Sequence, residues 1–130
     1  MYKEDVLEKA ENGIPHYMLE LAKLYKAGAF GDTDTDQYLY WLREFFQTSE
    51  VKKAANDGNG ATALLNDIVE AGISVGIYYS NSSDDHDLKA AAAALTAALN
   101  AGKQVGDKEV VNMISDMLTK INKRRGWLCQ

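Results

Sequence analysis

Three aspartates at alternating positions, Asp32, Asp34 and Asp36, have the spacing that comes closest to a metal site in this chain. A calcium loop of the EF-hand type begins with this alternation, then needs a glycine at its sixth position and a bidentate glutamate at its twelfth. Counted from Asp32, those two positions hold Gln37 and Arg43. Because the turn-forming glycine is absent and a cation replaces the acidic ligand, we do not expect calcium binding of this type.

The same aspartates are well placed to begin a helix. A carboxylate of Asp34 or Asp36 can accept hydrogen bonds from the free amides of the helix that follows, and negative charge is favourable at that helix end. The sequence therefore predicts that one of these two residues is an N-cap. A module that responds to divalent ions through Asp32, Asp34 and Asp36, or through the acidic stretch 84–87, is kept as an outside alternative.

Other side chains with chemical potential are few and scattered. His16 and His86 are the two histidines, and neither has a cysteine or glutamate at metal-ligand spacing. Cys129, next to the last residue, is a poor place to hold a nucleophile in position. The sequence contains no nucleophile elbow, phosphate-binding loop or dinucleotide fingerprint. We expect no catalytic residue, no metal site and no cofactor.

Composition indicates an ordinary globular protein. The chain has 130 residues, of which 46% are hydrophobic and 25% charged, and this balance is typical of a single folded domain. A lone cysteine makes no internal disulfide, which favours a reducing compartment. The first residues have no uninterrupted apolar segment of the secretory kind, and no run approaches a membrane span. We expect one helical domain over 1–130 in the cytoplasm, outside any membrane.

Apolar residues recur at helical spacing along most of the chain, and no convincing alternating strand is present. The pattern predicts an all-α fold, a compact stack of about six helices in antiparallel pairs. Residues 49–60, "SEVKKAANDGNG", are polar and contain two glycines, so they are predicted to be a linker. The first two predicted helices cover 3–11 and 15–27, and a third follows the acidic loop, with Tyr38, Trp41, Leu42 and Phe45 on one apolar stripe. The others cover 61–79 and about 86–101 with Gly102 as its stop, and Asp107 opens the last one.

Two glycines lie one helical turn apart in the fourth predicted helix. Gly72 and Gly76 each cost about 1 kcal/mol of helix propensity relative to alanine. Either a second helix crosses so closely that no side chain would fit there, or the helix breaks near Gly72. Both interpretations remain open from the sequence.

Seven residues in the first half of the chain stand at the offsets of a known helical repeat: Gly13, Leu21, Ala22, Tyr25, Gly28, Asp34 and Trp41. Their pattern resembles the Sel-one-like repeat, a relative of the tetratricopeptide repeat, with Ala22 in place of the family's helix-crossing glycine. A weaker second copy lies within 61–102. The resemblance implies a right-handed stack of paired helices that presents a surface to another protein.

Charge is unevenly distributed along the chain. The net charge is −5, yet Lys120, Lys123, Arg124 and Arg125 lie close together in a basic tail, 120–130, so the rest carries −9 (−5 less four positive charges). An acidic body favours a basic protein partner and repels nucleic acid. One interpretation is that the tail binds nucleic acid, with its cations on phosphate groups and Trp127 stacked on a base. The other is that the cations stabilise the C-terminal end of a helix and Trp127 packs on the core.

Taken together, these patterns predict a non-catalytic protein-binding module. We expect a bacterial immunity protein that binds and neutralises a basic toxin, of the nuclease type, rather than a protein that binds nucleic acid. The alternative is an adaptor or chaperone subunit, or a phage-encoded inhibitor. The predicted partner-binding residues are those of the acidic loops and the adjoining aromatic helix: Asp32, Asp34, Asp36, Tyr40, Glu44, Asp84, Asp85 and Asp87.

Overall fold

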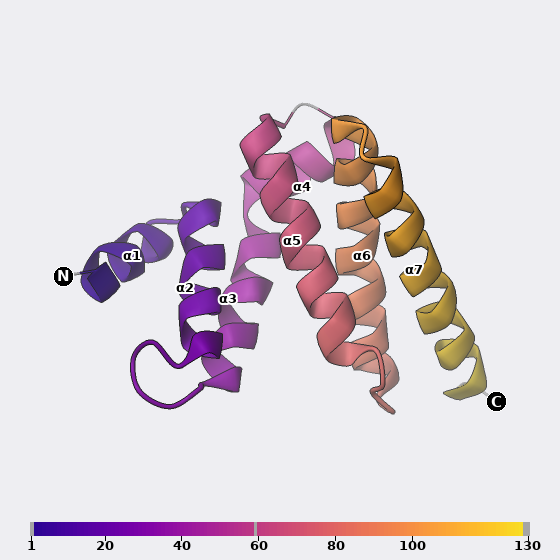
Figure 1. Cartoon of the computed structure of the whole chain (residues 1–130), viewed down its shortest axis with the longest axis horizontal. Helices are drawn as coiled ribbons and strands as arrows, with labels where there is room; N and C mark the ends of the chain where they lie inside the picture. The colour runs from indigo at the N-terminus through magenta and orange to yellow at the C-terminus, as the bar shows by residue number, and fades with distance from the viewer. Residues whose placement is uncertain (1, 59, 129–130) are drawn as a thin grey trace. The chain divides into compact units, whose positions relative to one another are not determined.

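The computed structural model describes residues 2–58 and 60–128, which contain seven α-helices and no β-strand (Figure 1). This confirms the all-α prediction, with one helix more than expected. The helices are α1 (Tyr2–Glu11), α2 (Pro15–Ala27), α3 (Thr35–Gln47), α4 (Ser49–Asp57), α5 (Thr62–Tyr79), α6 (Asp85–Val105) and α7 (Lys108–Leu128).

The chain divides into two compact units, with the boundary between Lys52 and Lys53 inside α4. In unit 1, the residues up to Lys52, α2 packs against both α1 and α3. In unit 2, the residues from Lys53 onward, α6 packs against both α5 and α7. Each unit is therefore built around one central helix with a neighbour on either side.

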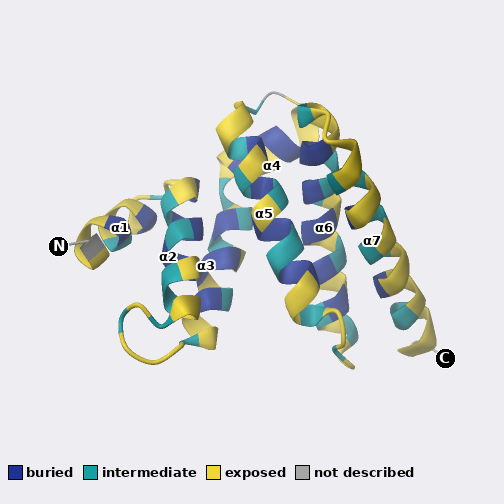
Figure 2. Ribbon diagram, viewed as in Figure 1, coloured by how far each residue is buried: buried dark blue, intermediate teal, exposed yellow. Residues whose placement is uncertain are grey.

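In unit 1 the predicted boundaries of α2 are confirmed. Pro15 occupies the first turn, where its missing N–H costs nothing. Gly28 ends the helix in the left-handed conformation at φ +72°, and its N–H donates to the carbonyls of Leu24 and Tyr25. This conformation is one that glycine adopts without strain. The apolar stripe that faces the neighbouring helices is buried (Figure 2): Met18, Leu19, Leu21 and Ala22.

The aspartate triplet lies in the loop before α3 and in the first turn of that helix. Asp34 is the N-cap, because its Oδ1 accepts a hydrogen bond from the amide of Gln37 at 3.1 Å, while Asp36 lies inside the first turn. One apolar face of this helix is buried, whereas Tyr40 on the opposite side is 46% exposed. The buried members are Tyr38, Trp41, Leu42 and Phe45.

The linker predicted over 49–60 is wrong for most of its length, since Ser49–Asp57 forms α4. Thr48 caps this helix, because its Oγ1 accepts a hydrogen bond from the amide of Val51 at 3.3 Å. Val51, Ala54 and Ala55 have the spacing of one helical face, and all three are buried. In unit 2 the side chain of Gln104 also donates to the carbonyl of Ala54 at 2.9 Å.

The two glycines of α5 mark a close helix crossing in unit 2, and the helix is unbroken from Thr62 to Tyr79. A Cβ placed on Gly72 would lie 2.5 Å from the Cβ of Ala98 and 2.6 Å from the carbonyl oxygen of Ala94. A Cβ on Gly76 would lie 2.8 Å from Cδ2 of Leu95. Of the two interpretations left open by the sequence, close crossing of α6 is therefore the one the structure supports.

The predicted stop of α6 at Gly102 is wrong. The helix continues to Val105, and Gly106 ends it with φ +75°. Gly102 is buried instead, and a Cβ there would lie 3.3 Å from Cγ2 of Val111 on α7. Its role is thus to let α7 approach α6, which is the same spatial role as that of the glycines in α5.

Within the described ranges, no single helix combines the length and the hydropathy needed to cross a membrane, although the bent pair of α4 and α5 would pass on length and composition alone. Cys129, on which the expectation of a reducing compartment rests, lies outside the described residues.

Candidate protein-binding surfaces

Three of the predicted partner-binding residues form one stripe on α3. Asp36, Tyr40 and Glu44 are four residues apart in turn, so they lie on the same side of the helix. Asp36 and Tyr40 are exposed, and Glu44 is partly exposed. We call these three residues the α3 stripe. With an aromatic ring between two carboxylates, it presents both apolar area and negative charge on a well-packed helix.

The carboxylates around Tyr40 are close enough to affect its ionisation. The negative charge of Glu44, and then a hydrogen bond with the same side chain, raise the pKa of Tyr40 above its ordinary value of 10.0. The charge of Glu11 raises it further by a smaller amount. Glu11, at the end of α1, thus adds to the negative field around Tyr40, although sequence analysis did not select it. Only the folding of α1 onto α2 could place it there.

We expect Glu44→Gln to lower the pKa of Tyr40 toward 10.0, and Glu11→Gln to lower it less. Because the raised pKa disfavours the phenolate in the folded chain, folding stability falls as pH rises past the ordinary phenol pKa, and removing Glu44 reduces that fall. NMR titration of tyrosine labelled at Cζ, assigned with Tyr40→Phe, measures the pKa. An unchanged pKa in Glu44→Gln would refute this account; Glu50→Gln is the control.

The loop before α3 gives Asp32 and Asp34 different roles. Asp34 makes two hydrogen bonds: its side chain caps α3, and its own amide donates to the carbonyl of Tyr25 at 3.1 Å. The hydroxyl of Thr33 also donates to the carbonyl of Lys26 at 3.2 Å. Asp32 is exposed in this pinned loop. Of the two, Asp32 is the residue whose carboxylate remains available to a partner.

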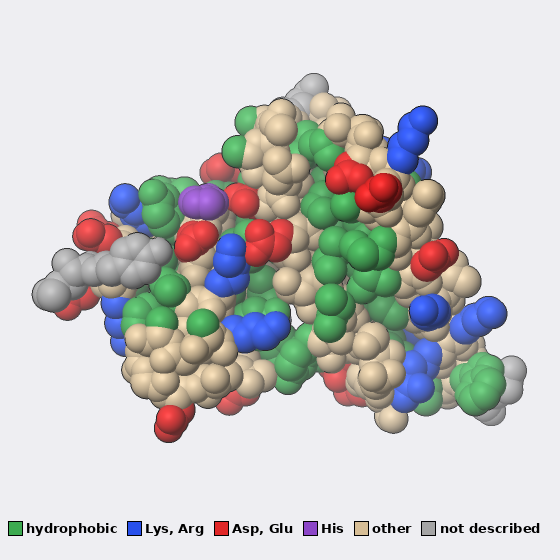
Figure 3. Space-filling view, in the orientation of Figure 1, with side chains coloured by type: hydrophobic (Ala, Val, Ile, Leu, Met, Phe, Trp, Pro, Cys, Tyr) green, Lys and Arg blue, Asp and Glu red, His purple; other side chains and the backbone are tan. Residues whose placement is uncertain are grey.

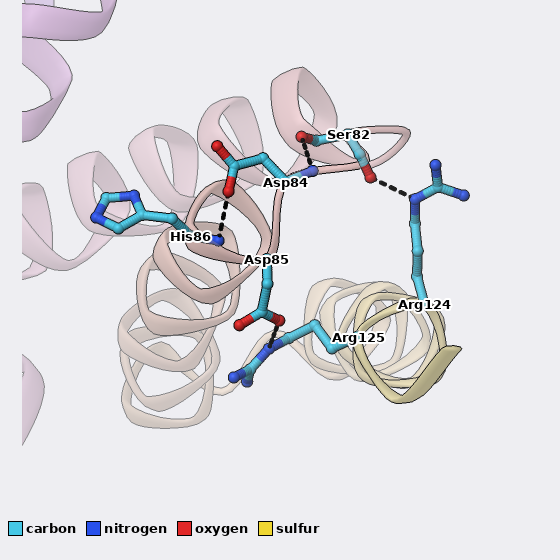
Figure 4. A network of polar contacts seen from close by, with 6 residues as sticks. All are labelled: Ser82, Asp84, Asp85, His86, Arg124 and Arg125. Carbon is cyan, nitrogen blue, oxygen red and sulfur yellow. Dashed lines mark hydrogen bonds and ion pairs between the residues drawn. The ribbon is translucent and has the colours of Figure 1, made fainter. Parts of the chain in front are cut away.

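The second predicted cluster, at the start of α6 in unit 2, is largely engaged in local structure (Figure 4). Asp84 is the N-cap, and its Oδ1 accepts from the amide of His86 at 2.9 Å. Asp85 forms an ion pair with Arg125 of α7, with 3.1 Å between Oδ1 and Nε. Asp87 accepts a hydrogen bond from the hydroxyl of Ser82 at 3.0 Å. These carboxylates stabilise the turn between α5 and α6.

The basic tail completes this turn. Arg124 donates to the backbone carbonyls of Asn81 and Ser82, and Figure 4 shows its side chain reaching the turn from α7. Two of the four tail cations are therefore bound within unit 2. Trp127 is 80% exposed, so the alternative in which it packs on the core is wrong.

The two acidic clusters differ in what they offer. The α3 stripe and Asp32 lie in unit 1 with exposed or, for Glu44, partly exposed side chains, while Asp84, Asp85 and Asp87 in unit 2 each hold a local partner. Among residues 2–58 and 60–128, no group of three or more histidine, cysteine, aspartate or glutamate side chains is arranged to hold a metal ion.

Searches against protein-family models, curated proteins and solved structures each found no match to this chain.

Proposed function

We propose that this chain is a non-catalytic protein-binding module, a cytoplasmic bacterial immunity protein that neutralises a basic toxin of the nuclease type. The observation that carries the proposal is the α3 stripe, in which exposed Tyr40 lies between Asp36 and Glu44. Tyrosine is enriched at the centres of protein interfaces, where its ring is buried and its hydroxyl keeps a polar partner. Carboxylates on either side complement a cationic surface and accelerate encounter.

The support of the stripe by the rest of unit 1 favours this use. Its helix is anchored by four buried side chains on the opposite face and by the Asp34 cap at its start. A surface already held in shape loses little conformational entropy on binding. Glu11 adds to the negative field around Tyr40, so a cation of the partner would meet carboxylates from two helices.

The Sel-one-like resemblance remains part of the proposal. Two helix pairs, α2–α3 and α5–α6, each begin their second helix with an aspartate N-cap, Asp34 and Asp84. The resemblance implies a similar start for the second helix of each pair, although Asp107 caps α7 in the same way. The same architecture would serve an adaptor, a chaperone subunit or a phage-encoded inhibitor, and these differ from an immunity protein in having several partners or no protective effect.

The test is growth rescue by co-expression with a toxin encoded beside the gene, followed by association kinetics of the purified pair. We expect rescue, and an association rate that falls steeply as salt rises. Asp36→Lys/Glu44→Lys should lower the association rate at low salt by about tenfold or more, because it reverses the charges that steer the partner. Tyr40→Ala should mainly speed dissociation.

The matched control is Asp57→Lys/Asp116→Lys, which changes net charge by the same amount at exposed positions on other helices, α4 and α7. A similar loss of rate in the control would assign the effect to net charge alone. No rescue by the natural chain, together with the capture of several unrelated proteins, would favour the adaptor.

A further inference from the structure

The first and last helices each have one outward face, and these two faces carry opposite charge. α1 packs against α2, and α7 packs against α6. On α1 the buried side chains are Val6 and Ala10, while Glu4, Asp5 and Glu8 are exposed. On α7 the buried side chains are Ile114 and Ile121. The exposed residues of its C-terminal part include Lys120, Lys123 and Trp127, and Figure 3 shows Lys and Arg side chains gathered over this part of α7.

The two lysines of α1 contact aromatic rings of unit 1, so the outward face of α1 is mainly negative. The Nζ of Lys3 lies 4.8 Å from the centre of the Phe30 ring, and that of Lys9 lies 4.6 Å from the centre of the Tyr17 ring. Such cation–π contacts hold the ammonium groups near the rings. In the part of the chain that is described, Glu4 and Glu8 have no ion-pair partner.

At the C-terminal end of α7 the exposed charges without a partner among the described residues are positive. Arg124 and Arg125 are bound to the α5–α6 turn. Lys120 and Lys123 have no ion-pair partner in the described ranges, although Asp116 lies one turn before Lys120. Trp127 follows them on the same side, 80% exposed. An exposed indole beside two lysines is a face that fits an acidic helix surface.

We propose that the outward face of α7 in one copy of this chain docks on the outward face of α1 in a second copy. The spacing agrees, because Glu4 and Glu8 on α1, like Lys120 and Lys123 on α7, are one helical turn apart. The α7 face also has a large exposed apolar residue near the C-terminal end of its helix, Trp127. The covered apolar area of Trp127 supplies the hydrophobic part of the contact.

This contact is head-to-tail. A copy that uses α7 still has its own α1 free, so association continues to a third copy unless a ring closes. The contact involves one helix pair, which places it among small and weak interfaces. We therefore expect reversible association that grows with protein concentration and weakens with salt. It uses other residues than the α3 stripe, so it holds or fails independently of the proposed toxin binding.

Charge exchange between two variants tests the proposal on the full chain. Lys120→Glu/Lys123→Glu makes both outward faces acidic, and Glu4→Lys/Glu8→Lys makes both basic. We expect each variant alone to associate at least about tenfold more weakly than the natural chain at low salt. An equimolar mixture should regain association, because every acidic face then finds a basic one. Sedimentation velocity over a range of concentrations, at about 20 mM and about 1 M salt, measures this.

Trp127→Ala provides a milder variant that keeps all charges, and we expect it to weaken association at both salt concentrations. Circular dichroism melting confirms that each variant is folded. A natural chain that is monomeric at all concentrations would overturn the proposal. It would equally be overturned if the mixture did not regain association. If Glu4→Lys/Glu8→Lys associated like the natural chain, the proposal would also fail, because that result indicates an α7–α7 contact.

Discussion

Gly72→Ala is expected to destabilise unit 2 by about 1–3 kcal/mol, although alanine is the better helix former by about 1 kcal/mol. The added methyl group would lie 2.5 Å from the Cβ of Ala98 and 2.6 Å from the carbonyl oxygen of Ala94. Neither atom can rotate away, because one is on the main chain and the other is bonded directly to it. Relief therefore requires α5 and α6 to separate, which loses packing along the whole crossing. Urea unfolding followed by circular dichroism measures the change.

Gly126→Ala is the matched control, since it makes the same substitution inside a helix with no atom within 4 Å of the added carbon. This variant should be neutral or more stable by up to about 1 kcal/mol, as helix propensity alone predicts. Opposite signs for the two substitutions would separate the crossing from the general properties of alanine. Equal stabilisation of both would show that α5 and α6 do not cross as closely as described.

A larger effect is expected from Leu95→Ala, because Leu95 is fully buried on α6 and its truncation leaves a cavity. Substitutions of this kind cost about 2–5 kcal/mol. The Cγ, Cδ1 and Cδ2 atoms of Leu95 would each lie within 3 Å of a Cβ on Gly76. Gly76→Ala alone should therefore also destabilise, by about 1–3 kcal/mol before the gain in helix propensity.

The two substitutions should compensate each other. In Gly76→Ala/Leu95→Ala the new methyl group occupies part of the space that the leucine leaves, so the combined cost should be smaller than the sum by about 0.5–3 kcal/mol. Leu95→Ala combined with Gly126→Ala is the additive reference, because the two sites share no contact. If the first pair were as additive as the reference, then the packing of Leu95 against Gly76 would be wrong.

Sequence periodicity predicts the helices well where one face is strongly apolar and a glycine or proline marks the end. Pro15 and Gly28 delimit α2 for that reason. It fails at α4, where a polar composition hides the short stripe of Val51, Ala54 and Ala55, although Thr48 at the cap position is a sequence signal for a helix start. It also fails at Gly102, because a glycine that admits a neighbouring helix has the same sequence signature as one that ends its own.

The candidate surfaces show a similar limit. The spacing of Asp36, Tyr40 and Glu44 along one helix is local, so the stripe is visible in the sequence. The pairing of Asp85 with Arg125 joins residues 40 positions apart, and the influence of Glu11 on Tyr40 depends on packing between helices. Contacts of this kind follow from the tertiary fold. Residue type alone therefore does not reveal that the predicted carboxylates in unit 2 already have local partners.

The order of helix packing bears on how the chain folds. The main contacts join helices that are consecutive in sequence, and proteins rich in such local contacts fold within microseconds to milliseconds. The bonds from Arg124 to Asn81 and Ser82 are different, because they bridge 43 and 42 residues. Closing a long loop costs entropy before any bond repays it. We therefore expect the bonds from Arg124 to the α5–α6 turn to form after α5 has packed on α6 and α6 on α7.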